Sequence, residues 1–270
     1  FHEDTRNFLE NKTTIDSSIK CNWYCKEIYG HKALLYQLNK NEVLCLKEGE
    51  WLSDGIVNLF MKYIYASWNN DTQSKCFIIN THFYAKLSTN SFESASKWVK
   101  NVNIFEREWI FIPIHENKEH WILTVIYNLN KVKNNEKAYI LYMDSMNTID
   151  NKKYTTINDK IERFLMYLWK QINQKDSNSK NILITGKIVE VTQQDPKDGN
   201  CGVFLLKNMD VFFQKNGFNN TTLQFDGLYN YKDGCEFRKI MRNKLSALIG
   251  EQKTILDRIK REQKNNFRQN

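Results

Sequence analysis

The chain has 270 residues, of which 41% are hydrophobic and 26% charged, and its formal net charge is +8 at pH 7. This length can bury one large or two small hydrophobic cores. No apolar stretch is long enough to cross a bilayer, no signal peptide is visible, and six scattered cysteines are far too few for a disulfide-stapled scaffold. We therefore expect a soluble protein, or a fragment of one because it begins at Phe1, with reduced thiols in the cytosol or nucleus.

The positive charge is concentrated at one end of the chain. From Arg238 to the C-terminus there are ten lysines and arginines against three acidic residues, which accounts for +7 of the net +8. A basic helical segment is usually a solvated surface. The charges of the rest of the chain nearly balance and give it no reason to bind nucleic acid.

The chain begins with a polar segment. Residues 1–32 lack periodicity, and we interpret them as an extension with at most one short element. Ala33–Gln37 predicts a short strand. A strongly apolar helix follows over Ile56–Ala66, with Ser53 or Asp54 supplying its N-cap oxygen.

The middle of the chain has the composition of β-strands. Three segments rich in β-branched and aromatic residues predict strands over Trp109–Ile114, Trp121–Tyr127 and Ala138–Asp144. The flanking elements, in chain order, are a buried segment over Lys75–Asn80, a short helix through Phe83 to Leu87, an amphipathic helix over Ile157–Ile172, a strand over Lys187–Val191, and helices over Cys201–Gln214 and Phe237–Ile249. Central strands with helices before and after predict an α+β domain. No repeat or linker divides it.

Two polar runs interrupt this pattern. Lys131–Lys137 (KVKNNEK) and Gln174–Asn181 (QKDSNSKN) are low in complexity, and we interpret both as surface insertions that do not pack.

Cys201 has the features of a nucleophile. It lies in Asp198-Gly199-Asn200-Cys201-Gly202, a turn that leads directly into an apolar helix. A helix N-terminus favours the thiolate form of a cysteine, and the two glycines allow close approach of backbone and substrate. Most free cysteines are small buried hydrophobic residues. We assign that role to the other five: Cys21, Cys25, Cys45, Cys76 and Cys235.

A cysteine nucleophile needs an imidazole and a group that orients it. His120 begins a predicted strand and Asp144 ends another, so the carboxylate can reach the ring. We interpret His2, His31, His82 and His115 as surface histidines. His115 and His120 are five residues apart, one more than a zinc-binding helical pair requires. Cys21, Cys25 and His31 lack a fourth ligand, so no metal or other cofactor is predicted.

An oxyanion donor is also required. Gln193 and Gln194 lie just before the Cys201 turn, and an amide of either could supply it.

Together, His120-Trp121, Asp144-Ser145, Gln194 and Cys201-Gly202, in that order, resemble the SUMO-specific cysteine proteases, whose active-site order is His, Asp, Gln, Cys. Trp51-Leu52-Ser53-Asp54 stands at the place of the family's Trp-Leu-Asn-Asp segment. The resemblance covers roughly Ala33 to Leu248 and is strongest to the branch that edits SUMO chains.

The resemblance implies a papain-like α+β fold with a central mixed or antiparallel sheet flanked by helices. It also implies a substrate whose C-terminal Gly-Gly passes through a narrow tunnel. Trp51 and Trp121 match the aromatic residues that roof the tunnel, although core packing is an alternative role for both. Asp54 matches an acidic residue that pairs with a basic residue of the modifier, and Gln194 matches the oxyanion donor.

The sequence departs from the family pattern in the Cys201 turn. Gln194 lies one residue farther from Cys201 than is usual, which leaves Gln193 as an alternative donor. Asn200 replaces the family's aspartate before the cysteine, and Ser53 replaces the motif asparagine.

These observations predict an extension (1–32), a SUMO-protease-like catalytic domain (33–250) and a basic helical tail (251–270). The expected activity is removal of SUMO from conjugates in the nucleus or cytoplasm, with no membrane partner. Two alternatives remain open: deconjugation of ubiquitin or a NEDD8-like modifier, and a binding module that does not cut.

Overall fold

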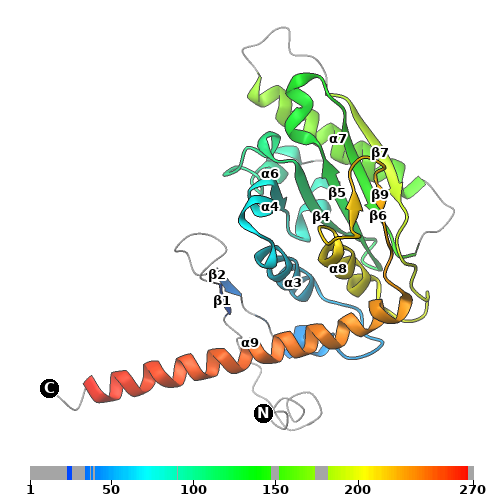
Figure 1. Cartoon of the computed structure of the whole chain (residues 1–270). Coiled ribbons are helices and arrows are strands. Elements are labelled where there is room, and N and C mark those ends of the chain that lie inside the picture. Colours follow the sequence, from blue (N-terminus) through cyan, green and yellow to red (C-terminus); the bar gives the residue numbers. More distant parts are fainter. Residues whose placement is uncertain are drawn as a thin grey trace.

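The computed structural model describes residues 23–25, 34–36, 38, 40–89, 91–146, 152–173 and 182–266 of the chain (Figure 1). Nearly all of the predicted extension and the whole polar run 174–181 lie outside these residues.

A five-stranded mixed sheet forms the centre of the molecule. Its order is β3-β4-β5-β6-β7, with antiparallel pairing in the middle and a parallel pair at each edge. The strands are β3 (Cys76–Ile78), β4 (Trp109–Glu116), β5 (His120–Tyr127), β6 (Ala138–Met143) and β7 (Ile184–Val189). β4, β5 and β6 lie at the predicted places. β7 begins three residues before the predicted strand over Lys187–Val191, and β3 forms within Lys75–Asn80, which the sequence predicts only as a buried segment. The α+β fold class is confirmed.

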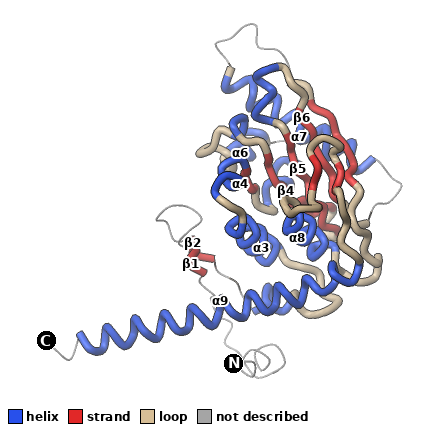
Figure 2. Tube along the Cα trace, in the orientation of Figure 1, coloured by secondary structure: helices blue, strands red, loops and turns tan. Residues whose placement is uncertain are grey.

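Helices cover both faces of the sheet (Figure 2). Alternate residues of one strand enter different cores: Leu123 and Val125 of β5 pack with α3 (Asp54–Ser67) and α8 (Cys201–Val211), while Ile122 and Ile126 pack with α5 (His82–Ser88) and α7 (Lys152–Ile172). Because both faces are buried, the strands are almost continuously apolar.

The remaining elements are short, apart from the last helix. They are β1 (Trp23–Cys25), β2 (Leu34–Tyr36), α2 (Lys40–Leu44), α4 (Asn70–Lys75), α6 (Phe92–Ser96), η1 (Ile104–Glu106), η2 (Leu129–Asn134), β8 (Phe218–Asn219), β9 (Gln224–Phe225) and α9 (Tyr231–Asn266). The predicted boundary at residue 250 lies inside α9, whose C-terminal part extends away from the sheet (Figure 1). Within the described part of the chain, no helix is long and apolar enough to span a membrane.

The helix that precedes the sheet begins as the sequence predicts. Ser53 is the N-cap of α3, and its hydroxyl accepts a hydrogen bond from the Ile56 N–H at 3.4 Å. This cap satisfies one of the free amides of the first turn.

One of the predicted insertions does pack. The segment Lys131–Lys137 contributes to η2, and Val132 is buried in the core on the α7 side of the sheet. The interpretation of this run as an unpacked surface segment is therefore wrong, because a single apolar side chain among polar neighbours is enough to anchor it.

A buried arginine of α9 ties together two turns of the chain. Arg238 is 2% exposed. Its guanidinium donates to five neutral oxygens at 2.8–3.2 Å, which are Cys45 O, Lys47 O, Glu50 O, Gly199 O and Asn200 Oδ1. Three of these carbonyls lie in the turn before Trp51, and the other two oxygens lie immediately before Cys201. Arg238 thus fixes both turns against α9.

We expect Arg238→Met to destabilise the protein by at least ~3 kcal/mol, because it leaves buried carbonyls without donors. For a domain of this size the melting temperature should fall by roughly 6–12 °C. Arg242→Met is the matched control, since Arg242 lies one turn later and its ion pair is with the exposed Glu48 carboxylate at 3.6 Å. Thermal unfolding that affects both variants equally would contradict the anchoring role.

Candidate active site

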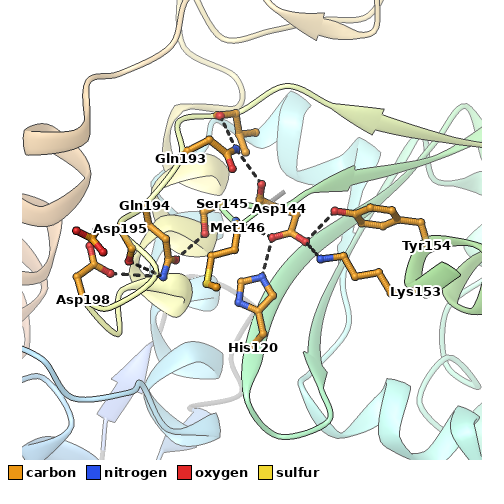
Figure 3. A network of polar contacts seen from close by, with 11 residues as sticks. His120, Asp144, Ser145, Met146, Lys153, Tyr154, Gln193, Gln194, Asp195 and Asp198 are labelled. Carbon is orange, nitrogen blue, oxygen red and sulfur yellow. Dashed lines mark hydrogen bonds and ion pairs between the residues drawn. The ribbon is translucent and has the colours of Figure 1, made fainter. Parts of the chain in front are cut away.

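The pairing of β5 and β6 brings His120 and Asp144 together. The register pairs Leu123 with Met143. Continued past the end of β6, it sets Ile122 opposite Asp144 and His120 opposite Met146, so His120 and Asp144 are diagonal neighbours on one face. The Nε2 atom of His120 lies 2.6 Å from Oδ1 of Asp144 (Figure 3).

The Asp144 carboxylate is buried, and four donors surround it. Its side chain is 0% exposed. Oδ1 accepts from His120 and from the Met146 N–H at 2.8 Å, whereas Oδ2 accepts from Lys153 Nζ at 2.6 Å and from the Tyr154 hydroxyl at 2.8 Å (Figure 3). A carboxylate has about four lone-pair sites, so its orientation is fixed from β5, from the turn after β6 and from α7.

These contacts shift the pKa of both members of the pair. Burial alone would lower the pKa of His120, but the hydrogen bond to Asp144 and the negative charges of Asp144 and Cys201 outweigh it and raise the pKa to about 9. Burial would raise the pKa of Asp144, but the His120 hydrogen bond and charge, followed by Lys153 and the Met146 N–H, keep it below its ordinary value. The resting pair is therefore imidazolium and carboxylate near neutral pH.

Cys201 is the first residue of α8, and it is buried. The turn before it needs glycine, because Gly199 has φ +63° and a Cβ there would lie 2.8 Å from Gly49 O. A Cβ on Gly202 would lie 3.0 Å from Leu52 Cβ and 3.1 Å from Trp121 Cδ1. Both glycines thus allow the close packing that holds Cys201 at the helix start.

The second ring nitrogen of His120 is available to Cys201. Nδ1 is buried and has no hydrogen-bond partner among the described residues. Cys201 is close enough to raise the pKa of the ring, although its sulfur makes no hydrogen bond of ordinary length with Nδ1. Catalytic hydrogen bonds are often long before substrate binds. The arrangement can therefore pass a proton between sulfur and imidazole, with Asp144 fixing the ring from the other side.

The two candidate glutamines make different contacts. The Gln193 amide donates to Asp144 O at 3.1 Å and to Val191 O at 2.9 Å. Gln194 is buried, and its Oε1 accepts from the Ser145 hydroxyl at 2.8 Å (Figure 3). Its Nε2 is thereby directed to the loop before Cys201, where it contacts Asp195 O and Asp198 Oδ1, both at 3.4 Å.

The two tryptophans have different environments. Trp51 is 54% exposed and its Cδ1 lies 3.0 Å from the Cβ position of Gly199. Trp121 is 1% exposed; its indole N–H donates to Leu52 O at 3.0 Å, and its ring stacks on His115 at a centroid distance of 3.9 Å. His115 is partly buried and stacks on Trp121, its register partner on the neighbouring strand, so it is not the free surface histidine that the sequence predicts.

Asp54 lies on the first turn of α3 and is partly exposed, with its carboxylate 3.9 Å from Nδ1 of His82.

Cys45 and Cys76 are buried, as the sequence predicts, while Cys235 is only partly buried. Within the described ranges, no group of three or more His, Cys, Asp or Glu residues could hold a metal ion. Cys21 and His31 lie outside those ranges.

Sequence reasoning missed four residues that contact this site: Ser145, Lys153, Tyr154 and Arg238. Ser145 was visible only as the neighbour of Asp144. The other three are helical residues, and no local signal distinguishes them from other lysines, tyrosines and arginines.

Known proteins resemble the chain in sequence and fold. The C-terminal catalytic domain of the Ulp1 protease family matches residues 50–251. A putative ubiquitin-like-specific protease 1B of Arabidopsis thaliana is 29% identical over 69% of this chain and 54% of its own length. Human sentrin-specific protease 2 is 28% identical over 66% of this chain and 28% of its own length. The chain thus spans about half or less of these relatives.

Solved structures share the fold. A crystal structure of a de-sumoylating protease covers 88% of this chain and 95% of its own, with a TM-score of 0.70 and 22% identity. The C-terminal Ulp1 protease domain in complex with Smt3, the yeast ortholog of SUMO, covers 88% of this chain and 90% of its own, with a TM-score of 0.60 and 19% identity. The papain-like arrangement of sheet and helices expected from the sequence agrees with these folds. With the family match over residues 50–251, the chain belongs to the Ulp1 family of proteases and contains its catalytic domain.

Proposed function

We propose that the chain is a cysteine protease that removes a SUMO-type modifier by hydrolysing the bond after the modifier's C-terminal Gly-Gly. The observation that carries this proposal is the buried His120–Asp144 pair, 2.6 Å apart, beside a cysteine at the start of α8. SUMO is the preferred modifier because the relatives and solved structures include SUMO proteases. Nuclear or cytoplasmic residence belongs to the same proposal.

In the proposed reaction, the Cys201 thiolate attacks the carbonyl carbon of the terminal glycine. The oxyanion accepts hydrogen bonds from Nε2 of Gln194 and from the Cys201 N–H, which is one of the free amides of the first turn of α8. The His120 imidazolium then donates its Nδ1 proton to the leaving amine of the target lysine, and a thioester forms. Water, deprotonated by His120, releases the modifier.

Gln194 is preferred over Gln193 as the oxyanion donor. The Gln193 amide donates to two backbone carbonyls at 2.9 and 3.1 Å, whereas both contacts of the Gln194 amide are long, at 3.4 Å, and leave it easier to redirect. In Gln194, the bond from Ser145 holds Oε1, so the NH₂ group faces the Cys201 turn.

The two tryptophans are proposed to line the tunnel for the Gly-Gly terminus of the modifier. Trp121, fixed by Leu52 and His115, forms the base of the passage, and the exposed indole of Trp51 closes it. A passage lined by two flat rings is proposed to admit only residues without side chains. Asp54, on the adjoining turn of α3, is proposed to pair with a basic residue of the modifier.

Modifier proteins carrying a C-terminal electrophile test the function directly. We expect the SUMO probe to form a covalent adduct, and the ubiquitin and NEDD8 probes to react much more slowly. Cys201→Ala should form no adduct and lower cleavage by roughly 10⁶-fold while still binding SUMO. Cys235→Ala, which removes a thiol that is only partly buried, is the control and should still react. An adduct that survives Cys201→Ala would refute the mechanism. Reaction only with the ubiquitin or NEDD8 probe would show that the enzyme acts on that modifier and not on SUMO.

Asp144→Asn should lower kcat by roughly 10³ to 10⁴ with little change in KM, because the amide cannot hold the imidazolium. The alkaline limb of the pH–kcat profile should also move to lower pH, since Asp144 helps to raise the pKa of His120 to about 9. Asp159→Asn removes an exposed carboxylate that contacts Arg163 at 3.5 Å, and this control should leave kcat and the pH profile unchanged. A loss confined to KM would mean that another group orients His120.

Trp51→Ala should lower kcat/KM by roughly 10²-fold, because the acyl group is no longer aligned with Cys201. Its melting temperature should change little, since more than half of the side chain is exposed. Trp98→Ala, at another exposed tryptophan (39%), should change neither kcat/KM nor the melting temperature. The wild type should cleave a Gly-Gly substrate and reject a Gly-Ala one. Equal cleavage of both substrates would show that no tunnel selects glycine.

A further inference from the structure

A lysine of α7 contacts the carboxylate of the proposed catalytic triad. Lys153 is the second residue of α7, and its Nζ lies 2.6 Å from Oδ2 of Asp144, the oxygen that does not contact His120. The Lys153 side chain is only 13% exposed, and its ammonium lies 4.9 Å from the centre of the Tyr154 ring. This ion pair is therefore partly buried and well defined, unlike a surface contact between mobile side chains.

We propose that Lys153 is a positioning residue for Asp144, whose cation both orients the carboxylate and balances its charge, so that the buried active site stays neutral. This proposal rests on the proposed function for its role in catalysis, but its electrostatic part does not depend on the reaction.

The charges of the site support the proposal. In the thiolate–imidazolium state, Cys201 and Asp144 are negative while His120 and Lys153 are positive, so the four groups sum to zero. Without Lys153, the same state would carry a net negative charge around a carboxylate that is 0% exposed. An unbalanced charge in such a place is costly.

The position of Lys153 also predicts the sign of its effect on His120. Two cations then share one carboxylate, so Lys153 weakens the attraction that holds the proton on the imidazole. Other groups face the pair as well: His115 and Glu116 from β4, of which Glu116 is the register partner of His120, Tyr154 from α7, and Cys201 from α8. Lys153 is the one cation among them that directly contacts the Asp144 carboxylate besides His120, within the part of the chain that is described.

Three variants separate charge from hydrogen bonding. Lys153→Met removes the cation and its hydrogen bond. Lys153→Arg keeps a cation at the same place. Tyr154→Phe removes the other hydrogen bond to Oδ2 and leaves the charge unchanged.

The experiment is an NMR titration of His120 in these variants, each in the Cys201→Ala background so that the thiol does not titrate. Lys153→Met should raise the pKa of His120 by about one unit, because a cation within about 6 Å is lost. Lys153→Arg should restore the parent value, and Tyr154→Phe should shift it by less than half as much as Lys153→Met. In the active enzyme, Lys153→Met should lower kcat roughly tenfold and move the alkaline limb upward, opposite to Asp144→Asn.

An unchanged His120 titration in Lys153→Met, even with a lower melting temperature, would overturn the proposal by showing that Lys153 only stabilises the fold. An equal shift in Lys153→Arg would also overturn it, because charge would then not be the cause. If the wild type cleaves no modifier but the titration shifts as expected, the proposed function fails and the electrostatic role of Lys153 stands.

Discussion

The site depends on a carboxylate that water does not reach. Asp144 is held by four donors from three parts of the chain, and its bond to His120 is possible only because the β5–β6 register makes the two residues diagonal neighbours. A shift of one residue in that pairing would move His120 to the opposite face of the sheet. The β5 side chains that pack into the cores on both faces hold the strand in this register. The core packing that sets the β5–β6 register therefore also sets the position of His120 relative to Asp144.

The other half of the site is assembled from turns. Cys201 begins a buried helix, and the turn before it is not part of a helix or strand. Arg238 stabilises this turn by donating hydrogen bonds to Gly199 O and Asn200 Oδ1. The same guanidinium holds the turn before Trp51. Nucleophile and proposed tunnel roof are thus fixed by one side chain of α9. α9 contributes no reacting group, but its Arg238 holds the turns before Cys201 and Trp51 in place.

Much of this architecture could be predicted from sequence, because the central strands are rich in β-branched and aromatic residues, the helices have apolar periodicity, and the candidate residues fall at the ends of these elements. His120 begins β5, Asp144 follows β6 and Cys201 begins α8, which are positions where local pattern and chemistry coincide. Lys153 and Arg238 could not be predicted. Each is one of 39 basic residues in the chain, and its partner is fixed only by tertiary packing. His115 was misread for the same reason, since its stacking on Trp121 follows from β4–β5 pairing across a tight turn. Val132 shows the converse, a buried residue hidden in a polar run.

The central claim is that Cys201, His120, Asp144 and Gln194 act on one carbonyl group. A crystal structure of the protein covalently joined to a SUMO-derived C-terminal glycine tests it most directly. The account predicts that the glycine is attached to Sγ of Cys201, with its oxygen about 3 Å from Nε2 of Gln194 and Nδ1 of His120 facing the sulfur while Nε2 keeps its bond to Asp144. Attachment at another cysteine, or a His120 ring turned away from Asp144, would contradict it.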